Sequence, residues 1–293
     1  MAKKMETKSA RLLALILALI MIGSVFAMLP RGEKAVFQRE IKYEFEGFDE
    51  WLKCLQPSPD QIIYVNAKTD DEELKDYIDS IIVKNWNRYI FANLRLDSPI
   101  QNMLVASYRD GLIYMIDVNK TRIFYAGQKE DYKGLNVKYS NGVMLVSEIS
   151  PFIIGTAPRV ASAVDSILSG HNTLDLVSNY TSRIPNNFNI IFMFYGEYAN
   201  MLISGGNFSD YIDFYLEGIK VNESKYEKIV AIHFKSTGGF ANYSVNDTEV
   251  TEYYNFTNYD DGFSIAVMQD GNFTKLLNAQ PRLQPVIFIE PAE

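Results

Sequence analysis

The sequence predicts an α+β protein in which an N-terminal transmembrane helix precedes two tandem half-domains, each an antiparallel sheet with helices on one face. Three observations lead to this prediction. A long apolar run lies near the N-terminus, short strand-like segments with glycine turns fill the remainder, and the order of the segments repeats after residue 183. With 47% hydrophobic and 22% charged residues among 293, the composition is typical of a globular chain.

The run from Leu12 to Leu29 contains no charged residue, and four basic residues precede it. A helix of this length spans about 27 Å, close to the roughly 30 Å of a bilayer core. The positive-inside rule then places the N-terminus in the cytoplasm. We therefore expect a basic tip and signal-anchor over residues 1–30, and a single-pass protein of the cell membrane with residues 33–293 extracellular.

A cleavable signal peptide is the alternative interpretation of the same run. Residues 12–23 would form its apolar region, and Val25-Phe26-Ala27 resembles a small-residue cleavage site. Both interpretations place residues 33–293 outside the cell, so the predicted side of the membrane does not depend on the choice.

Residues 31–60 are expected to form a stalk whose short amphipathic helix packs on the first half-domain. The first half-domain, residues 61–183, begins with the buried strand 61–67 and continues into a helix that starts near Thr69. Thr69 and Glu72 have the spacing of a capping box. The apolar side of this helix is predicted to contain Leu74, Tyr77, Ile78, Ile81 and Ile82.

Two glycine dipeptides mark hairpins in the first half-domain. Asp110-Gly111 and Asn141-Gly142 are both expected to be two-residue turns, because such turns need positive φ angles. The half-domain then closes with a strand leading to a helix that is capped by Thr156, contains Pro158 in its first turn and stops at Gly170.

The second half-domain, residues 184–293, repeats this order of elements. It begins with the strand 190–196, followed by a helix predicted over 209–219 from the helical spacing of its apolar residues. A hairpin around Gly238-Gly239 is expected next, then two strands joined through Asp261-Gly262. A short helix over 271–280 and a last strand over 285–291 complete the half-domain.

Glycosylation signals are unusually frequent, since eight asparagines are followed two residues later by Ser or Thr, where about two matches would arise by chance. Glycans must remain on the surface, so these side chains are expected to be exposed outside the cell. The predicted acceptors are Asn119, Asn179, Asn207, Asn222, Asn242, Asn246, Asn255 and Asn272. This excess, the absence of a possible disulfide and the short signal-anchor together lead us to expect an archaeal chain.

The charge of the chain argues against nucleic acid as a partner. The formal net charge is −8 although the leader is basic, so the remainder is strongly acidic and repels phosphate backbones. The only cysteine, Cys54, lies beside Trp51 and is expected to be a small buried hydrophobic residue.

No catalytic, metal or cofactor site is predicted. His171 is expected in a surface turn and His233 as a half-buried strand residue, and their spacing brings no metal ligands together. The pair Asp70-Asp71 is expected to open a helix, while Asp260-Asp261 lacks the spacing of a calcium loop.

A family resemblance is carried by "NGVMLVSEISPFIIGTAPRVASAVDSILSGHNTL" (141–174) and "RIPNNFNIIFMFYG" (183–196). These stretches resemble uncharacterised prokaryotic, archaeal proteins that are membrane-anchored, extracytoplasmic and built from two α+β half-domains. The resemblance implies fold and location. That family has no assigned catalytic residues, so it implies none here.

From these observations we expect a non-enzymatic interaction or accessory module of the cell envelope, anchored in the membrane through the run from Leu12 to Leu29. Its partner would be an envelope protein or another copy of the chain. Two alternatives remain open. One is an ectodomain that binds a small molecule or glycan in a cleft between the half-domains. The other is an envelope hydrolase that uses a pair of carboxylates.

Overall fold

The computed structural model describes residues 39–119, 122–170, 180–185, 187–199, 212–222, 224–235, 239–241, 251–281 and 285–287. The predicted signal-anchor therefore lies outside the described residues. Within those residues, no helix is both long and apolar enough to cross a membrane. The described chain is α+β and consists mostly of antiparallel sheet, which confirms the predicted fold class at this level.

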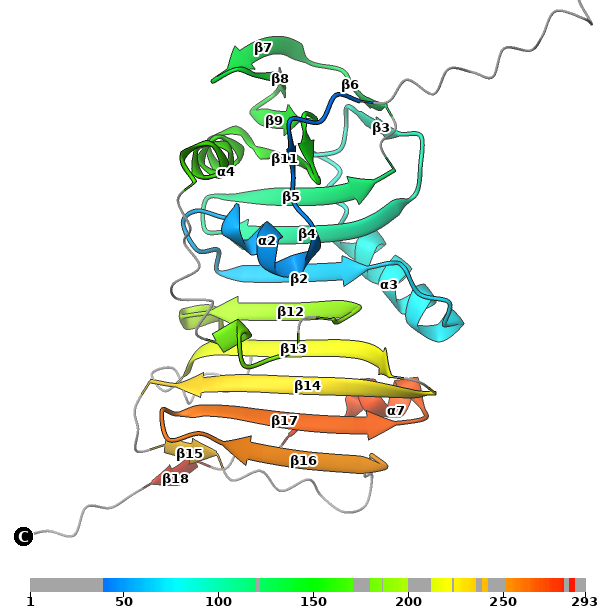
Figure 1. Ribbon diagram of the computed structural model, residues 1–293, viewed down its shortest axis with the longest axis vertical. Coiled ribbons are helices and arrows are strands. Elements are labelled where there is room, and N and C mark those ends of the chain that lie inside the picture. The colour runs from blue at the N-terminus through cyan, green and yellow to red at the C-terminus, as the bar shows by residue number, and fades with distance from the viewer. Residues whose placement is uncertain are drawn as a thin grey trace, which may run out of the picture. The chain divides into compact units, whose positions relative to one another are not determined.

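The first part of the chain supplies the upper strands of the large sheet in Figure 1 and the helices beside them. In order, the elements of this part are β1 (Tyr43–Glu44), α2 (Gly47–Lys53), β2 (Gln61–Asn66), α3 (Glu72–Asn85), β3 (Leu94–Leu96), β4 (Ile100–Tyr108), β5 (Gly111–Val118), β6 (Ile123–Tyr125), β7 (Gln128–Tyr132), β8 (Leu135–Ser140), β9 (Val143–Val146), β10 (Ile149–Ser150), β11 (Phe152–Thr156) and α4 (Ala157–Ser169).

The later elements comprise five further strands of this sheet, a separate two-stranded sheet and a short helix. They are β12 (Ile190–Tyr195), β13 (Ile212–Asn222), β14 (Lys225–Phe234), β15 (Gly239–Ala241), β16 (Tyr253–Asn258), β17 (Phe263–Asp270), α7 (Phe273–Asn278) and β18 (Pro285–Ile287).

Twelve strands form one sheet in the order β16-β17-β14-β13-β12-β2-β4-β5-β11-β9-β8-β7. Near its centre lies the antiparallel pair β2–β12, in which Ile63 lies opposite Phe192. This pair joins strands of the two predicted half-domains by backbone hydrogen bonds, so they contribute to one sheet instead of two. On either side of it the next strands follow in chain order, β4 and β5 on one side and β13 and β14 on the other. The boundaries 61–183 and 184–293 stay a prediction.

Helices cover both faces of the sheet, which corrects the expectation of helices on one face. Leu74 of α3 and Leu276 of α7 belong to the core on one face, whereas Trp51 of α2 and Val164 of α4 belong to the core on the other. The reason is visible in β2, whose residues 62–65 are buried on both sides of the strand. Both faces are apolar, and each requires a cover.

Helix α3 forms as its apolar spacing predicts, with Leu74, Ile78 and Ile81 buried. Its cap differs from the prediction. The N-cap is Asp71, whose Oδ1 accepts a hydrogen bond of 2.8 Å from Leu74 N, while Thr69 Oγ1 accepts one from Asp71 N. Asp is at least as good an N-cap as Thr, and its position one turn before the buried face decides where the helix starts.

A helix is predicted over 209–219, but its described part, residues 212–219, belongs to strand β13. Ile212, Phe214 and Leu216 are buried, and Asp213 and Tyr215 between them are half-buried, which is the period of a strand. The segment also satisfies a helical spacing, so the sequence pattern was ambiguous. Strand pairing selects the strand over the helix, because β13 is hydrogen bonded to β12 on one side and to β14 on the other.

Two of the predicted hairpin turns also need correction. Tyr108 pairs with Gly111, so the turn residues are Arg109-Asp110. Gly111 is required for another reason, because an added Cβ would lie 2.1 Å from Thr156 Oγ1. The strand around Gly239 pairs with β18 and not with β14. The Asn141-Gly142 turn is confirmed, with positive φ angles at both residues.

Candidate functional site at the N-terminal attachment

The chain enters the described unit along a short parallel strand pair. In β1 and β10, Tyr43 lies opposite Ile149 and Glu44 opposite Ser150. Lys42 N donates to Glu148 O at 2.7 Å, and Phe45 N donates to Ser150 O at the same distance. A two-residue strand pair is weak by itself, so side chains must hold this segment in place.

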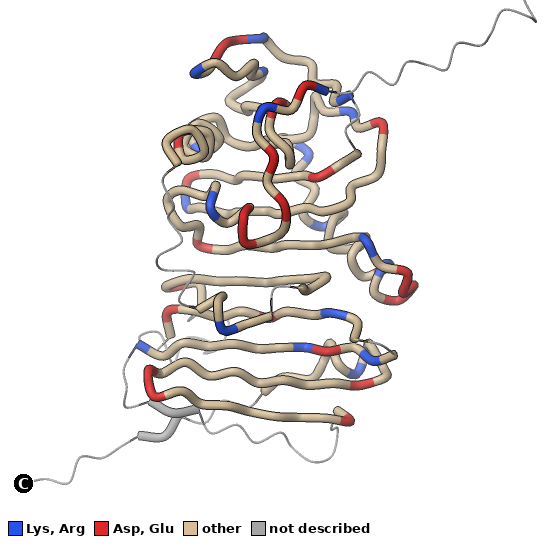
Figure 2. The backbone as a smooth tube through the Cα atoms, in the orientation of Figure 1, with Lys and Arg blue, Asp and Glu red and all other residues tan. Residues whose placement is uncertain are grey.

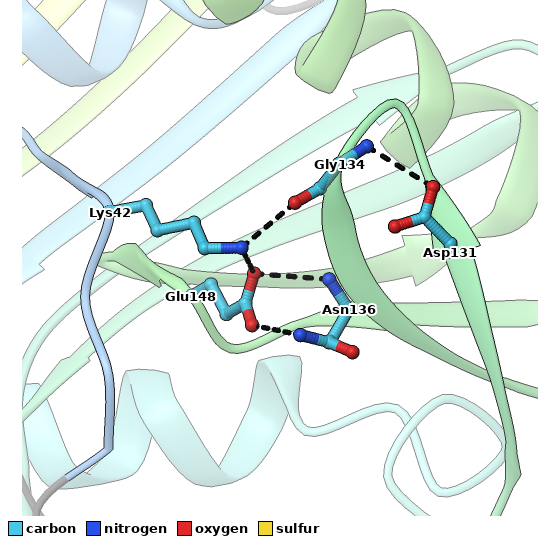
Figure 3. Close-up of polar contacts among 5 residues, drawn as sticks. All are labelled: Lys42, Asp131, Gly134, Asn136 and Glu148. Atoms are coloured by element: carbon cyan, nitrogen blue, oxygen red, sulfur yellow. Dashed lines mark hydrogen bonds and ion pairs between the residues drawn. The ribbon is translucent and has the colours of Figure 1, made fainter.

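Lys42 and Glu148 supply the main side-chain contact (Figure 3). Lys42 Nζ lies 2.8 Å from Glu148 Oε2 and donates at 2.8 Å to the carbonyl oxygen of Gly134. Glu148 also accepts two hydrogen bonds from Asn136, one from its backbone N at 3.0 Å and one from Nδ2. We call Lys42, Asn136 and Glu148, together with Arg39, the attachment cluster.

The charges of the attachment cluster reinforce each other. Burial would raise the pKa of the Glu148 carboxyl, but hydrogen bonds from Lys42 and Asn136 outweigh it and hold this pKa below its usual value. The hydrogen bond to Glu148 in turn raises the pKa of the Lys42 ammonium. Both groups are therefore charged near neutral pH, and the contact is a charge-assisted hydrogen bond.

The Arg39 side chain binds the segment 147–150 and so holds the beginning of the described chain in place. Its guanidinium donates to the carbonyl oxygens of Ser147 and Ile149 at 3.4 and 3.3 Å and to Ser150 Oγ at 3.3 Å, and it lies 5.9 Å from the ring centroid of Phe152. Burial lowers the pKa of this guanidinium. The attachment cluster therefore holds residues 39–45 against the segment 147–150.

No sequence pattern predicts the attachment cluster. Arg39 and Lys42 lie about a hundred residues from Ser147 and Glu148 in the chain, and no short motif links the two segments. The short helix expected within residues 31–60 is present as α2, whereas the stalk itself stays a prediction. Trp51 and Phe48 of α2 pack on Tyr64 of β2, with ring centroids 5.8 and 5.1 Å apart.

A second polar cluster surrounds His233, which is half-buried on strand β14 as predicted. Its Nδ1 lies 2.6 Å from Asp213 Oδ1 and 3.1 Å from the Tyr180 hydroxyl, and its Nε2 lies 3.2 Å from the carbonyl oxygen of Asp261. Asp213 sits at an irregularity in the β13–β14 register, which turns its side chain toward the histidine. The sequence pattern does not predict this pairing, because the apolar spacing of 209–219 also fits a helix.

Both ring nitrogens of His233 are occupied by protein oxygens, so a substrate could reach either nitrogen only by displacing one of them. Arg183 extends the cluster through an ion pair of 2.6 Å with Asp261 and lies over the Phe263 ring. The hydrogen bond from Arg183 lowers the pKa of the Asp261 carboxyl. This arrangement fastens residues 180–184 to the end of the sheet. His171 lies outside the described residues.

The predicted glycosylation sites are partly described. Asn119, Asn222, Asn255 and Asn272 are all exposed. Asn272 also caps α7, since its Oδ1 accepts a hydrogen bond of 2.8 Å from Lys275 N. Its Asn-x-Thr pattern therefore has a structural explanation as well. Outside the described residues lie Asn179, Asn207, Asn242 and Asn246.

The remaining candidate residues have structural partners. Asp71 caps α3 and accepts a hydrogen bond of 2.8 Å from the Tyr226 hydroxyl through Oδ2. Cys54 is buried, as predicted, and burial raises the pKa of its thiol to about 12. In the part of the chain that the structure describes, no three His, Cys, Asp or Glu side chains are placed to hold a metal ion.

Comparison with known proteins finds one relative along almost the whole chain. An uncharacterized protein of Archaeoglobus fulgidus is 36% identical over 298 residues, which cover 97% of this chain and 95% of that protein. Residues 44–168 match the AF_2048_N family N-terminal domain. The relative is archaeal and has no assigned role, in agreement with the resemblance found in the sequence.

Solved structures show only weak similarity. Crystal forms III and IV of TP0453 give a TM-score of 0.42 each, at 9% and 7% identity. The alignments cover 77% and 78% of this chain and 96% of each crystallised chain. TM-scores of this size do not establish a common fold.

Proposed function

The chain belongs to the family of the uncharacterized Archaeoglobus fulgidus protein, and from this premise we propose that it is a membrane-anchored, extracytoplasmic module of the cell envelope that binds another protein and catalyses no reaction. In this proposal the run from Leu12 to Leu29 holds the chain in the membrane with its N-terminus in the cytoplasm. Residues 33–293 lie outside, and the partner is an envelope protein or a second copy of the chain.

The attachment cluster is the observation that carries the proposal. Nine residues separate Leu29 from Arg39, so these two residues can lie at most about 35 Å apart when the segment is fully extended. Arg39 and Lys42 fix the chain to the sheet at the end of this segment. An anchor in the membrane would therefore keep the sheet close to the membrane surface, where envelope proteins are found.

Surface asparagines give independent support for an extracytoplasmic location. Asn119, Asn222 and Asn255 are exposed and lie outside helices or at accessible strand positions, where a glycan can be accommodated. The ligand-binding alternative has no comparable support. Its expected cleft lies where β2 and β12 pair directly, and this junction is a hydrogen-bonded strand pair.

Membrane attachment is tested on the full-length chain by washing isolated membranes with alkaline carbonate. We expect the native chain to stay in the pellet, and a variant with Leu17→Arg and Ile20→Arg to be released, because each central charge disfavours insertion by about 2.5–3.5 kcal/mol. Mass spectrometry of the same material identifies the N-terminus and the occupied asparagines. A mature N-terminus near residue 28, in released protein, would contradict the anchor.

The interaction role is tested by crosslinking in intact membranes, followed by affinity purification and mass spectrometry. We expect reproducible crosslinks to one envelope protein or between copies of the chain. The matched control is the released Leu17→Arg, Ile20→Arg variant, which should lose the crosslinks that depend on membrane proximity. A native chain without any reproducible crosslink would contradict an interaction role.

A further inference from the structure

Among the described strands, β7 and β16 are the two outer strands of the twelve-stranded sheet. An outer strand exposes backbone donors and acceptors to which another chain can add, and proteins commonly protect such edges with charged side chains. β7 follows this rule, since Lys129, Glu130 and Asp131 are three of its five residues. The hairpin of β7 and β8 is accordingly red and blue in Figure 2, whereas β16 is tan along its length.

β16 has the composition of a strand that adds readily to another. Its six residues, YYNFTN, contain no charge, proline or glycine, and aromatic and β-branched residues make up four of them. The nearest charged residues in the sequence, Glu252 and Asp260, lie beyond the two ends of the strand. A second copy of β16 could therefore pair antiparallel with the first without placing like charges opposite one another.

The backbone of β16 shows which groups face outward. Tyr259 N donates to Phe263 O across the β16–β17 hairpin, so this N–H points toward β17. Because N–H directions alternate along a strand, Asn255 N–H also points toward β17 and Phe256 N–H points away. Phe256 N donates to Asn255 Oδ1 at 2.9 Å. The Asn255 side chain therefore already covers one outward donor at the middle of the edge.

Asn255 also lies on the open face of the strand. Tyr254 and Phe256 pack against the core on one face, whereas Asn255 points to the other face and is exposed. Tyr253 on this same face is 46% exposed. Asn255 is followed by Thr257 and forms one of the predicted acceptor triplets.

We propose that a glycan on Asn255 prevents β16 from pairing with β16 of a second copy of this chain. A paired strand would lie about 4.8 Å away, with its facing side chains about 5 Å from the Asn255 side chain. A bulky, hydrated sugar on Asn255 occupies that space and replaces the charged residues that protect β7. The inference rests on the proposed extracytoplasmic location, because only there can the glycan be attached.

Substitutions at Thr257 separate the glycan from the asparagine. Thr257→Ala removes the acceptor triplet but leaves Asn255 and its bond to Phe256, whereas Thr257→Ser retains the triplet and is the matched control. Full-length protein from a glycosylating host is solubilised in detergent and examined by light scattering after gel filtration. We expect Thr257→Ala to self-associate at a concentration at least tenfold lower than Thr257→Ser. Adding Tyr253→Lys to Thr257→Ala should restore the behaviour of Thr257→Ser.

A second control uses Asn222→Gln, which removes an exposed acceptor triplet at the β13–β14 turn, away from the edge. It should not change self-association. Equal association of Thr257→Ala and Thr257→Ser, or an unoccupied Asn255 in native protein, would overturn the inference. In either case, glycans on other asparagines would still support the proposed extracytoplasmic location. If no asparagine is occupied in membrane-extracted protein, the inference and the proposed location both fail.

Discussion

Lys228 and Glu217 form an ion pair inside the sheet, with Lys228 Nζ 2.9 Å from Glu217 Oε1 and the lysine side chain completely buried. The two residues lie on neighbouring strands, β14 and β13. Lys228 also donates to the carbonyl oxygen of Leu277 at 3.1 Å, and Glu217 Oε2 accepts from the Tyr215 hydroxyl at 3.0 Å. Leu277 is in α7, so the buried ammonium links this short helix to the sheet.

Removing the charge of one member of this pair should lower the free energy of unfolding far more than removing both charges. Glu217→Gln leaves the Lys228 charge buried without a counter-charge, and we expect a loss of about 3–5 kcal/mol in the free energy of unfolding. Lys228→Met combined with Glu217→Gln should recover most of it, because two apolar or neutral groups need no charge compensation. Urea unfolding of the three proteins checks this, and equal losses in the single and double variants would contradict it.

An exposed pair provides the control for this prediction. Arg109 and Glu197 lie 2.6 Å apart, but their side chains are 69% and 78% exposed. Water screens such a pair, so Glu197→Gln should change the free energy of unfolding by less than about 1 kcal/mol.

Local patterns predicted the fold where they had one interpretation. Strand β2 is predicted by its continuous apolar run, and helix α3 by the helical spacing of its apolar residues. Helix α4 is predicted by the proline in its first turn and the glycine that ends it. Strand β13 was missed because its apolar residues satisfy two periods, and only pairing with β12 and β14 selects one. The β7–β8 hairpin was missed because its Lys133-Gly134 turn is an unusual dipeptide, although both residues have positive φ.

The attachment cluster could not be predicted for a different reason. Glu148 and Lys42 look like ordinary surface residues in the sequence, and only the order of strands brings them together. Local periodicity carries no information about which strands become neighbours. The exposed asparagines were easier to predict, because their signal lies entirely within three residues.

Glycine at position 155 should be indispensable. Gly155 lies in β11, between β5 and β9, and an added Cβ would be 2.1 Å from the carbonyl oxygen of Leu112. Gly155→Ala must push β5 and β11 apart, and we expect a loss of about 1–3 kcal/mol in the free energy of unfolding. Gly271→Ala is the control, since its Cβ would meet Glu252 Oε1 at an ordinary 3.4 Å. Thermal melts with equal shifts for both variants would argue against this close approach.

Acid should weaken the attachment cluster through Glu148. Its pKa in the folded chain is below the usual value, so its contribution to stability is complete above the usual glutamate pKa. That contribution is lost as the pH falls through the lowered value. We expect the stability difference between the native chain and Glu148→Gln to be constant from pH 7 to about 5 and to shrink below about pH 4.5. Unfolding by urea at each pH measures it, and a difference independent of pH would exclude this role of Glu148.

Lys42 should control the local opening of β1 rather than the global stability of the sheet. Its ammonium joins Glu148 Oε2 and the Gly134 carbonyl, and β1–β10 is only a two-residue pair. In Lys42→Met the backbone bond from Phe45 N to Ser150 O loses this support, so the Phe45 amide should exchange its hydrogen faster while amides of β4 and β5 keep their protection.

Lys133→Met is the matched control for Lys42→Met. Lys133 is also an exposed lysine near this edge of the sheet, but it pairs with Asp165 of α4 at 2.7 Å and does not touch β1. Its removal should leave exchange at Phe45 unchanged. If hydrogen exchange at Phe45 is as slow in Lys42→Met as in Lys133→Met, the backbone pair β1–β10 and Arg39 hold the segment without Lys42. The side-chain contacts of Lys42 would then be a consequence of attachment and not its cause.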